Sequence, residues 1–233
     1  MAELTDVDVK SHLALGLDFD DPLYALERAY ALREWFGIAK VGHELYAAAG
    51  PAIIAQLRDI GYGVFLDAKL HDIPNTVRSA ARVLSRYGLA YLNFHTSGGL
   101  DMLRAGIEGA TEGAHEAGVA VPKLLGVTVL TSDSDTSAFA GRLDLAAASG
   151  CDGVVCSALE VERVQQTHPG LLTMVPGIRL AGADSNDQAR VATPFDAIRN
   201  GADVLVIVRT VHHASDPNAA AAQVFSEVAS ALD

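Results

Sequence analysis

Short apolar segments alternate with Ala-rich amphipathic segments along the chain. The apolar segments predict strands at His12–Phe19, Ile38–Gly42, Gly63–Lys69, Ala90–His95, Pro122–Leu130, Cys151–Ser157, Leu171–Pro176 and Asp203–Val208. The amphipathic segments predict helices at Pro22–Phe36, Pro51–Ile60, Thr76–Tyr87, Leu100–Ala117, Thr136–Ser149, Ala158–Thr167, Thr193–Asn200 and Asn218–Leu232. Strands that are apolar on both faces are typical of parallel sheets covered by helices.

Local signals support several of these helix boundaries. Capping side chains precede a proline at Asp21-Pro22, Thr193-Pro194 and Asp216-Pro217, which is a common way to begin a helix. Glycines at the expected C-caps stand at Gly61, Gly88, Gly118 and Gly150.

Eight strand–helix units without a Pro/Ser-rich linker predict an α/β fold, a single (β/α)8 TIM barrel over residues 1–233. The alternative is an open doubly wound sheet. It is less favoured because no G-x-G-x-x-G motif follows the first predicted strand.

The composition limits the classes of partner. The formal net charge is −12, and half of the residues are hydrophobic. An acidic chain is a poor binder of nucleic acid polymers or anionic membranes, although a few local cations can still hold a small anion. No apolar run is long enough for a membrane span. Cys151 and Cys156 are expected to be packed, reduced thiols, and we expect a cytoplasmic protein.

Charged residues lie near the carboxyl ends of the first three predicted strands. They are Asp18, Lys40, Asp67 and Lys69. Catalytic groups of such barrels gather at this end, and residues two apart on a strand share a face. The four groups could merely be a salt-bridge network that ties strand ends together. Burying charges costs several kcal/mol unless they are paired, so we favour a site in which carboxylates hold a lysine ready to donate a proton.

The segment 65–76, Phe-Leu-Asp-Ala-Lys-Leu-His-Asp-Ile-Pro-Asn-Thr, resembles the signature of the orotidine 5′-phosphate decarboxylase family, whose members make UMP from OMP. Other segments match that family in the same order, at Lys40–Tyr46, His95–Gly99, Val127–Ser132, Asp152–Ser157 and Pro176–Arg179. The Asp-x-Lys-x-x-Asp part is shared with sister phosphosugar enzymes. The resemblance covers nearly the whole chain.

The resemblance implies roles for the charged residues. Lys69 would protonate the C6 carbanion that remains after CO2 leaves, and Asp67 would lie beside the departing carboxylate and help to orient the lysines. Lys40 would complete the charged array and hold a ribose hydroxyl, while Asp18 would also bind ribose.

The resemblance also implies a homodimer with active sites shared across its interface. Asp72, with Ile73 and Thr76, would reach into the partner's site. Thr131 and Ser132 would face the pyrimidine ring. No metal and no organic cofactor is expected.

The phosphate end of the substrate would lie against the loops after strands seven and eight. The residues that match family ligand positions there are Pro176, Arg179, Gln188, Val208 and Arg209. The segment 177–188 is expected to act as a mobile lid. Val208 and Thr210 stand where the family usually has glycine and proline, so phosphate binding is expected to be weaker or reshaped.

Two other functions stay open. One is a related decarboxylase of the same superfamily that acts on a modified pyrimidine nucleotide or a phosphosugar, the latter with Mg²⁺. The other is a nucleotide-binding protein without catalysis. His71 and His95 are expected to be structural, and the His212-His213 pair is not expected to bind a metal.

Overall fold

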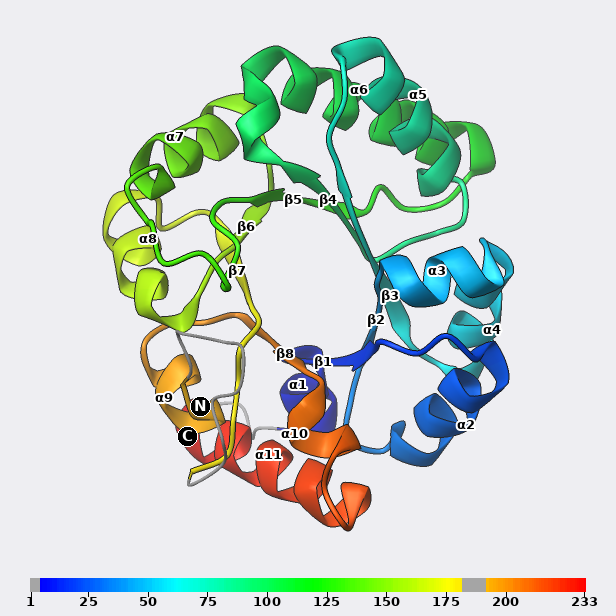
Figure 1. Cartoon of the computed structure of the whole chain (residues 1–233), viewed down its shortest axis with the longest axis vertical. Coiled ribbons are helices and arrows are strands. Elements are labelled where there is room, and N and C mark those ends of the chain that lie inside the picture. Colours follow the sequence, from blue (N-terminus) through cyan, green and yellow to red (C-terminus); the bar gives the residue numbers. More distant parts are fainter. Residues whose placement is uncertain (1–4, 182–191) are drawn as a thin grey trace.

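A closed ring of parallel strands, surrounded by helices, forms the centre of this computed structural model (Figure 1). The structure describes residues 5–181 and 192–233. The strands follow one another around the ring in sequence order, and the last pairs with the first. They are β1 Leu13–Leu17, β2 Ile38–Val41, β3 Gly63–Leu70, β4 Tyr91–His95, β5 Lys123–Val127, β6 Gly153–Val155, β7 Leu172–Val175 and β8 Val204–Ile207. The predicted (β/α)8 barrel is confirmed.

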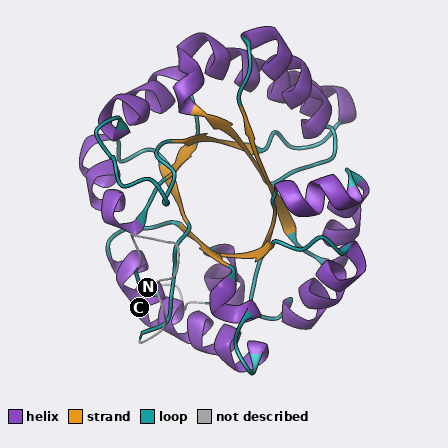
Figure 2. Cartoon of the chain, viewed as in Figure 1, coloured by secondary structure: helices purple, strands orange, loops and turns teal. Residues whose placement is uncertain are grey.

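Helices cover the outside of the ring (Figure 2). They are α1 Asp6–Ser11, α2 Pro22–Leu32, α3 His43–Ala49, α4 Ala52–Ile60, α5 Pro74–Ser85, α6 Gly99–Ala117, α7 Phe139–Ser149, α8 Val161–Thr167, α9 Pro194–Arg199, α10 Arg209–His212 and α11 Pro217–Leu232. Short 3₁₀ turns at Thr96–Gly98 and Ala158–Glu160 precede α6 and α8.

Three short helices were not among the predicted ones. The helices α1, α3 and α10 each contain seven residues or fewer, too few for a periodic pattern to show in the sequence. Strand β5 ends at Val127 rather than Leu130, because the residues that follow turn over the mouth of the barrel.

The predicted caps are confirmed except for Gly88, because α5 ends at Ser85 with Arg86 as its C-cap and Gly88 follows two residues later. The Asp21 carboxylate accepts hydrogen bonds from the backbone N–H groups at the start of α2, and Asp216 does the same for α11. Gly61, Gly118 and Gly150 end their helices in the left-handed conformation. Both cysteines are buried and free.

Two apolar cores follow from the period of two along each strand. A smaller core inside the ring includes Ala14, Ile38, Phe65, Val204 and Val206. The larger core lies between strands and helices. Positions two residues beyond the inner core therefore point into the mouth of the barrel, where the strands end.

Helices α5 and α6 approach each other unusually closely. A Cβ added at Gly113 would lie 1.9 Å from the carbonyl oxygen of Arg82. Arg82 also forms ion pairs with Glu112 and Glu116 of α6. This packing fixes α5, whose N-terminal end follows β3 directly.

Candidate active site

The four predicted charged groups meet at the mouth of the barrel. The Lys40 Nζ lies 2.7 Å from Asp18 Oδ1 and 3.8 Å from Asp67 Oδ2. The Lys69 Nζ lies 2.6 Å from Asp67 Oδ1. Asp67 therefore stands between two ammonium groups, and the sequence-based expectation that these groups converge is confirmed.

Strand register explains three of the four positions. Lys40 pairs with Gly16 of β1 and with Phe65 of β3. Asp18 and Asp67 lie two residues beyond those partners, so the period of two carries them to the same side as Lys40.

Lys69 reaches the cluster by a different route from the regular alternation that we expected. The pairing of β3 with β4 shifts between Leu66 and Leu70. Lys69 has a φ of 46°, and it is the only non-glycine residue with positive φ in the described part of the chain. This left-handed conformation costs a bulky residue about 1–2 kcal/mol, which the surrounding contacts must offset.

Asn93 of β4 supplies the contacts that hold this backbone. Its Oδ1 accepts a hydrogen bond from the Lys69 backbone N–H at 2.7 Å, and its Nδ2 donates to Asp67 Oδ1 at 2.6 Å. The Asn93 side chain is fully buried. The sequence analysis missed Asn93, although a lone amide within the apolar strand Tyr91–His95 was a visible signal.

The charges keep Asp67 ionised. Burial by itself raises the pKa of the Asp67 carboxyl. The ammonium groups of Lys40 and Lys69, with hydrogen bonds from Lys69 and Asn93, outweigh burial and hold that pKa below its ordinary value. The cluster is thus a fixed array of alternating charges beside a cavity.

That cavity has a volume of about 190 Å³ and contains all four charged groups in its wall; we call it the charged chamber. The rest of its lining is mostly apolar and includes Val127, Val155 and Thr131. Ser132 is exposed and does not line the chamber. The structure therefore brings Thr131 to the cluster and leaves Ser132 outside it.

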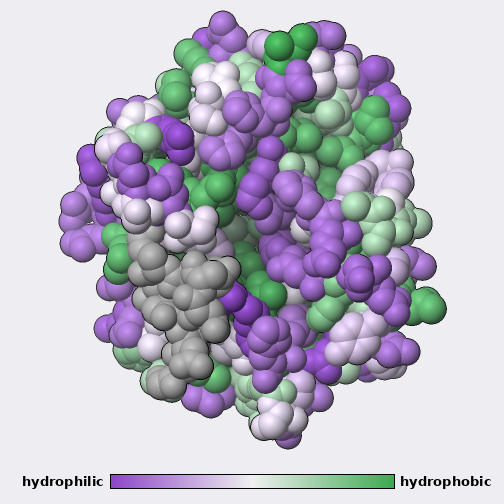
Figure 3. Space-filling view, viewed as in Figure 1, coloured by the Kyte–Doolittle hydropathy of each residue, from purple (hydrophilic) through white to green (hydrophobic). Residues whose placement is uncertain are grey.

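A second cavity of about 570 Å³ adjoins the first and is lined by Arg179 and Arg209; we call it the arginine chamber. Pro176 and Val208 line both chambers. The Arg179 guanidinium is buried and donates to the Ile178 carbonyl oxygen at 2.8 Å. Figure 3 shows the mouth as a central hollow with both polar and apolar residues around it.

Part of the expected lid lies outside the described residues. Gln188 and residues 182–191 belong to this part, so their predicted contribution to phosphate binding stays a prediction. Thr210 is described, and its hydroxyl donates to the Ile178 carbonyl oxygen at 2.7 Å. The residue that replaces the usual proline thus ties the end of β8 to the segment after β7.

His212 borders the arginine chamber. Its Nε2 donates to the Gly16 carbonyl oxygen at 2.8 Å, and its ring packs edge-on against Phe19. Its Nδ1 is buried without a hydrogen-bond partner among the described residues. Burial lowers the pKa of His212, so the ring is neutral at pH 7.

The three residues expected to serve a partner's site lie outside the two chambers of their own chain. Asp72, Ile73 and Thr76 are all exposed, and Ile73 retains 66% of its accessible surface. The Asp72 carboxylate accepts a hydrogen bond from the Ile73 backbone N–H at 2.6 Å. None of the three lines either chamber of its own chain.

The remaining predicted histidines stack on each other. The His71 and His95 ring centroids are 5.5 Å apart, and the His95 Nδ1 is hydrogen-bonded to the Ser97 hydroxyl. Burial lowers the pKa of His95, as do the nearby charges of Arg142, His71 and Lys69. Among residues 5–181 and 192–233, no group of three or more His, Cys, Asp or Glu side chains could hold a metal ion.

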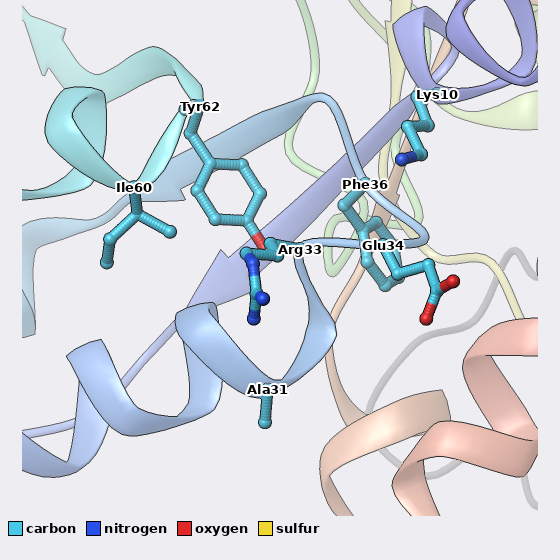
Figure 4. Close-up of a pocket in the computed structure, with 8 residues that line it drawn as sticks. Lys10, Ala31, Arg33, Glu34, Phe36, Ile60 and Tyr62 are labelled. Carbon is cyan, nitrogen blue, oxygen red and sulfur yellow. The ribbon is translucent and has the colours of Figure 1, made fainter.

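A further cavity lies at the opposite end of the barrel, before strands β1 to β3 (Figure 4). It has a volume of about 460 Å³ and is lined by Lys10, Arg33, Glu34, Phe36 and Tyr62, among others. It lacks the array of alternating charges. In this fold the reactive groups lie at the carboxyl ends of the strands, so we assign the chemistry to the two chambers at the mouth.

Comparisons with known proteins agree with this geometry. The model of the "Orotidine 5'-phosphate decarboxylase / HUMPS family" matches residues 11–224. The chain is 43% identical to the orotidine 5′-phosphate decarboxylase of Nitratidesulfovibrio vulgaris (strain DP4), over 94% of this chain and 98% of that protein. It is 40% identical to the enzyme of that name from Lactiplantibacillus plantarum, over 94% of this chain and 99% of the relative.

The fold comparison points the same way. The crystal structure of orotidine 5′-phosphate decarboxylase from Lactobacillus acidophilus superposes with a TM-score of 0.79 and is 34% identical in sequence. That alignment covers 93% of this chain and 98% of the other. No described helix is both long enough and apolar enough to cross a membrane.

Proposed function

Because this chain belongs to the orotidine 5′-phosphate decarboxylase / HUMPS family, we propose that it decarboxylates orotidine 5′-monophosphate to UMP and CO2. The observation that carries the proposal is the position of Lys69. Its ammonium group is held 2.6 Å from Asp67 in the wall of a small cavity with a mostly apolar remainder.

The reaction needs a group that both stabilises and protonates a carbanion. When the bond between C6 and the carboxylate breaks, CO2 leaves and the electron pair stays on C6. The Lys69 Nζ then gives a proton to C6, which yields UMP. A preorganised ammonium group stabilises the developing charge without reorganisation, because Asp67 and Asn93 already hold it in place.

The other charged residues bind and orient the substrate in this proposal. Asp67 lies beside the departing carboxylate, and Lys40 and Asp18 contact the ribose. Arg179 and Arg209, with the residue Gln188 of the undescribed segment, hold the phosphate. Binding energy from these remote contacts can then be used at the reacting carbon.

We also propose a homodimer with shared sites. Asp72, Ile73 and Thr76 are exposed and do not line the chambers of their own chain. An isoleucine that is two-thirds exposed next to a carboxylate suits a surface that a second copy covers. The two buried, free cysteines fit a reducing compartment, so the proposal includes a cytoplasmic location.

The experiment is an absorbance assay for the loss of the orotate chromophore when purified protein is mixed with OMP. The parent chain should turn OMP over. The turnover rate of Lys69→Ala should be at least about 1,000-fold lower, since this change removes both the proton donor and a charge of the array. Lys123→Ala is the matched control, because Lys123 pairs with Asp152 at the other end of the barrel. A chain that binds UMP but leaves OMP unchanged would contradict the proposal.

A further inference from the structure

The two chambers at the mouth share part of their wall. Asp18, Pro176, Val206 and Val208 line both of them. Val208 is the outermost of three inward-facing positions on β8 and its extension, after Val204 and Val206. It therefore stands at the passage that joins the charged chamber to the arginine chamber.

Val208 is matched to a residue without a side chain on the neighbouring strand. Ala14 of β1 pairs with Val206, so Gly16 comes to lie beside Val208. A Cβ added at Gly16 would be 2.5 Å from Val208 Cγ2 and 2.9 Å from Lys40 Cε. The valine side chain thus fills the space that Gly16 leaves empty and lies close to the lysine of the charged cluster.

The backbone of Val208 has a φ of −129° and a ψ of −93°, so it does not adopt the left-handed conformation that favours glycine. What the valine adds at the position of the family's usual glycine is a branched side chain next to Gly16. The Val208 carbonyl oxygen accepts the hydrogen bond from the His212 backbone N–H that begins α10. The isopropyl group is consequently fixed between Gly16 on one side and the passage on the other.

We propose that Val208 is a specificity-determining residue that narrows the passage between the two chambers. It weakens the binding of ligands that occupy both chambers at once and does not change the affinity for ligands that occupy only one chamber. This inference rests on the proposed function, since a pyrimidine nucleotide is the ligand that joins an aromatic ring in one chamber to a phosphate in the other.

The test compares three probes by equilibrium binding at one ionic strength: UMP, uridine and inorganic phosphate. UMP spans the passage, whereas uridine and phosphate each need one chamber. Val208→Gly should lower the Kd for UMP at least fivefold. It should change the Kd values for uridine and for phosphate less than twofold. The Kd of Val208→Ala for UMP should lie between those of the parent and Val208→Gly. This variant separates the effect of side-chain volume from the effect of the greater backbone freedom of glycine.

Two further variants sharpen the test. Val155→Ala is the matched control, because Val155 lines only the charged chamber. This variant should change the Kd values for UMP and uridine by the same factor. Gly16→Ala should weaken UMP in the parent, because its new methyl group collides with Val208. In the Val208→Gly chain that collision is absent, so the fold increase in the Kd for UMP caused by Gly16→Ala should be at least five times smaller than in the parent.

Two results for Val208→Gly would overturn the inference: equal changes in the Kd values of all three probes, or UMP binding that is unchanged or weaker. Turnover of OMP by the parent would still support the proposed function in either case. Failure of the parent to bind UMP or to decarboxylate OMP would overturn the proposed function, and this inference with it.

Discussion

The side chain of Asn93 accepts a hydrogen bond from the backbone N–H of Lys69, the one described non-glycine residue with positive φ. The bond links β4 to the irregular end of β3 and fixes the direction in which the lysine leaves the strand. Positioning of the proposed proton donor therefore depends on a residue that never needs to contact substrate.

Replacing Asn93 with Ala should lower kcat about 10- to 100-fold and leave KM nearly unchanged, because a misplaced proton donor affects the chemical step more than binding. The Lys69 backbone N–H, which loses its hydrogen bond to Asn93 Oδ1, should also cost about 1–3 kcal/mol of folding stability. Steady-state kinetics and denaturant unfolding measure the two effects. Asn200→Ala, at the end of α9, is the control, and equal losses in both variants would contradict a positioning role.

Shared active sites predict complementation between two inactive variants. Lys69→Ala and Asp72→Asn should each lose at least about 100-fold in OMP turnover when assayed alone. In an equimolar mixture that exchanges subunits at random, half of the dimers are hybrids with one intact site, so about a quarter of the parent activity should return. Sedimentation of the mixture checks that dimers form. Dimers that form without any recovery would place Asp72 outside the partner's site.

The close approach of α5 and α6 predicts different outcomes for two Gly→Ala changes. Gly113→Ala should destabilise the chain by at least about 2 kcal/mol, because its methyl group would overlap the Arg82 carbonyl oxygen and the helices would have to separate. Gly141→Ala in α7 meets nothing within 4 Å, so it should stabilise by about 0.5–1 kcal/mol through backbone entropy alone. Thermal unfolding of both variants, side by side, decides whether the contact is as tight as described.

The neutral His212 predicts a loss of stability at acidic pH. Burial lowers its pKa in the folded chain from the ordinary value of 6.5. Below pH 6.5 the unfolded chain binds the additional proton and the folded chain does not, so stability falls until the folded pKa is reached. Above pH 6.5 the ring is neutral in both states and has no effect.

The free energy of unfolding, measured between about pH 7 and pH 5, should therefore fall less steeply for His212→Gln than for the parent. His95 contributes with the same sign, because its pKa is also lowered. His115→Gln, at an exposed position near the end of α6, controls for the loss of a histidine. A slope that is identical in all three chains would show that His212 takes up its proton without cost.

Removal of metal ions distinguishes the proposed decarboxylation of OMP from the alternative function, a Mg²⁺-dependent reaction on a phosphosugar. In the proposed reaction the charge that acts on the carbanion is the Lys69 ammonium group, so OMP turnover should be unchanged after dialysis against a strong chelator. Activity that disappears and returns with Mg²⁺ would favour the phosphosugar alternative.

The sequence was informative where the chemistry follows the strand period. Asp18, Lys40 and Asp67 could be brought together from the alternation along three strands, and the barrel followed from eight repeated units. Lys69 was correctly placed in the cluster, yet its left-handed backbone was not predicted, because a register shift depends on how β3 meets β4. The match of Val208 with Gly16 was missed for a related reason, since these residues are far apart in sequence and adjacent only once the ring has closed.

Closure of the ring between β1 and β8 has a consequence for synthesis of the protein. The charged cluster comes from the first third of the chain, whereas Val208 and Arg209 follow the last strand. A growing chain on the ribosome therefore contains Lys40 and Lys69 long before the residues of β8 that close the ring around them have been added. Nascent chains that end before β8 thus contain the residues of the charged cluster without Val206 and Val208, which form part of the wall of the charged chamber.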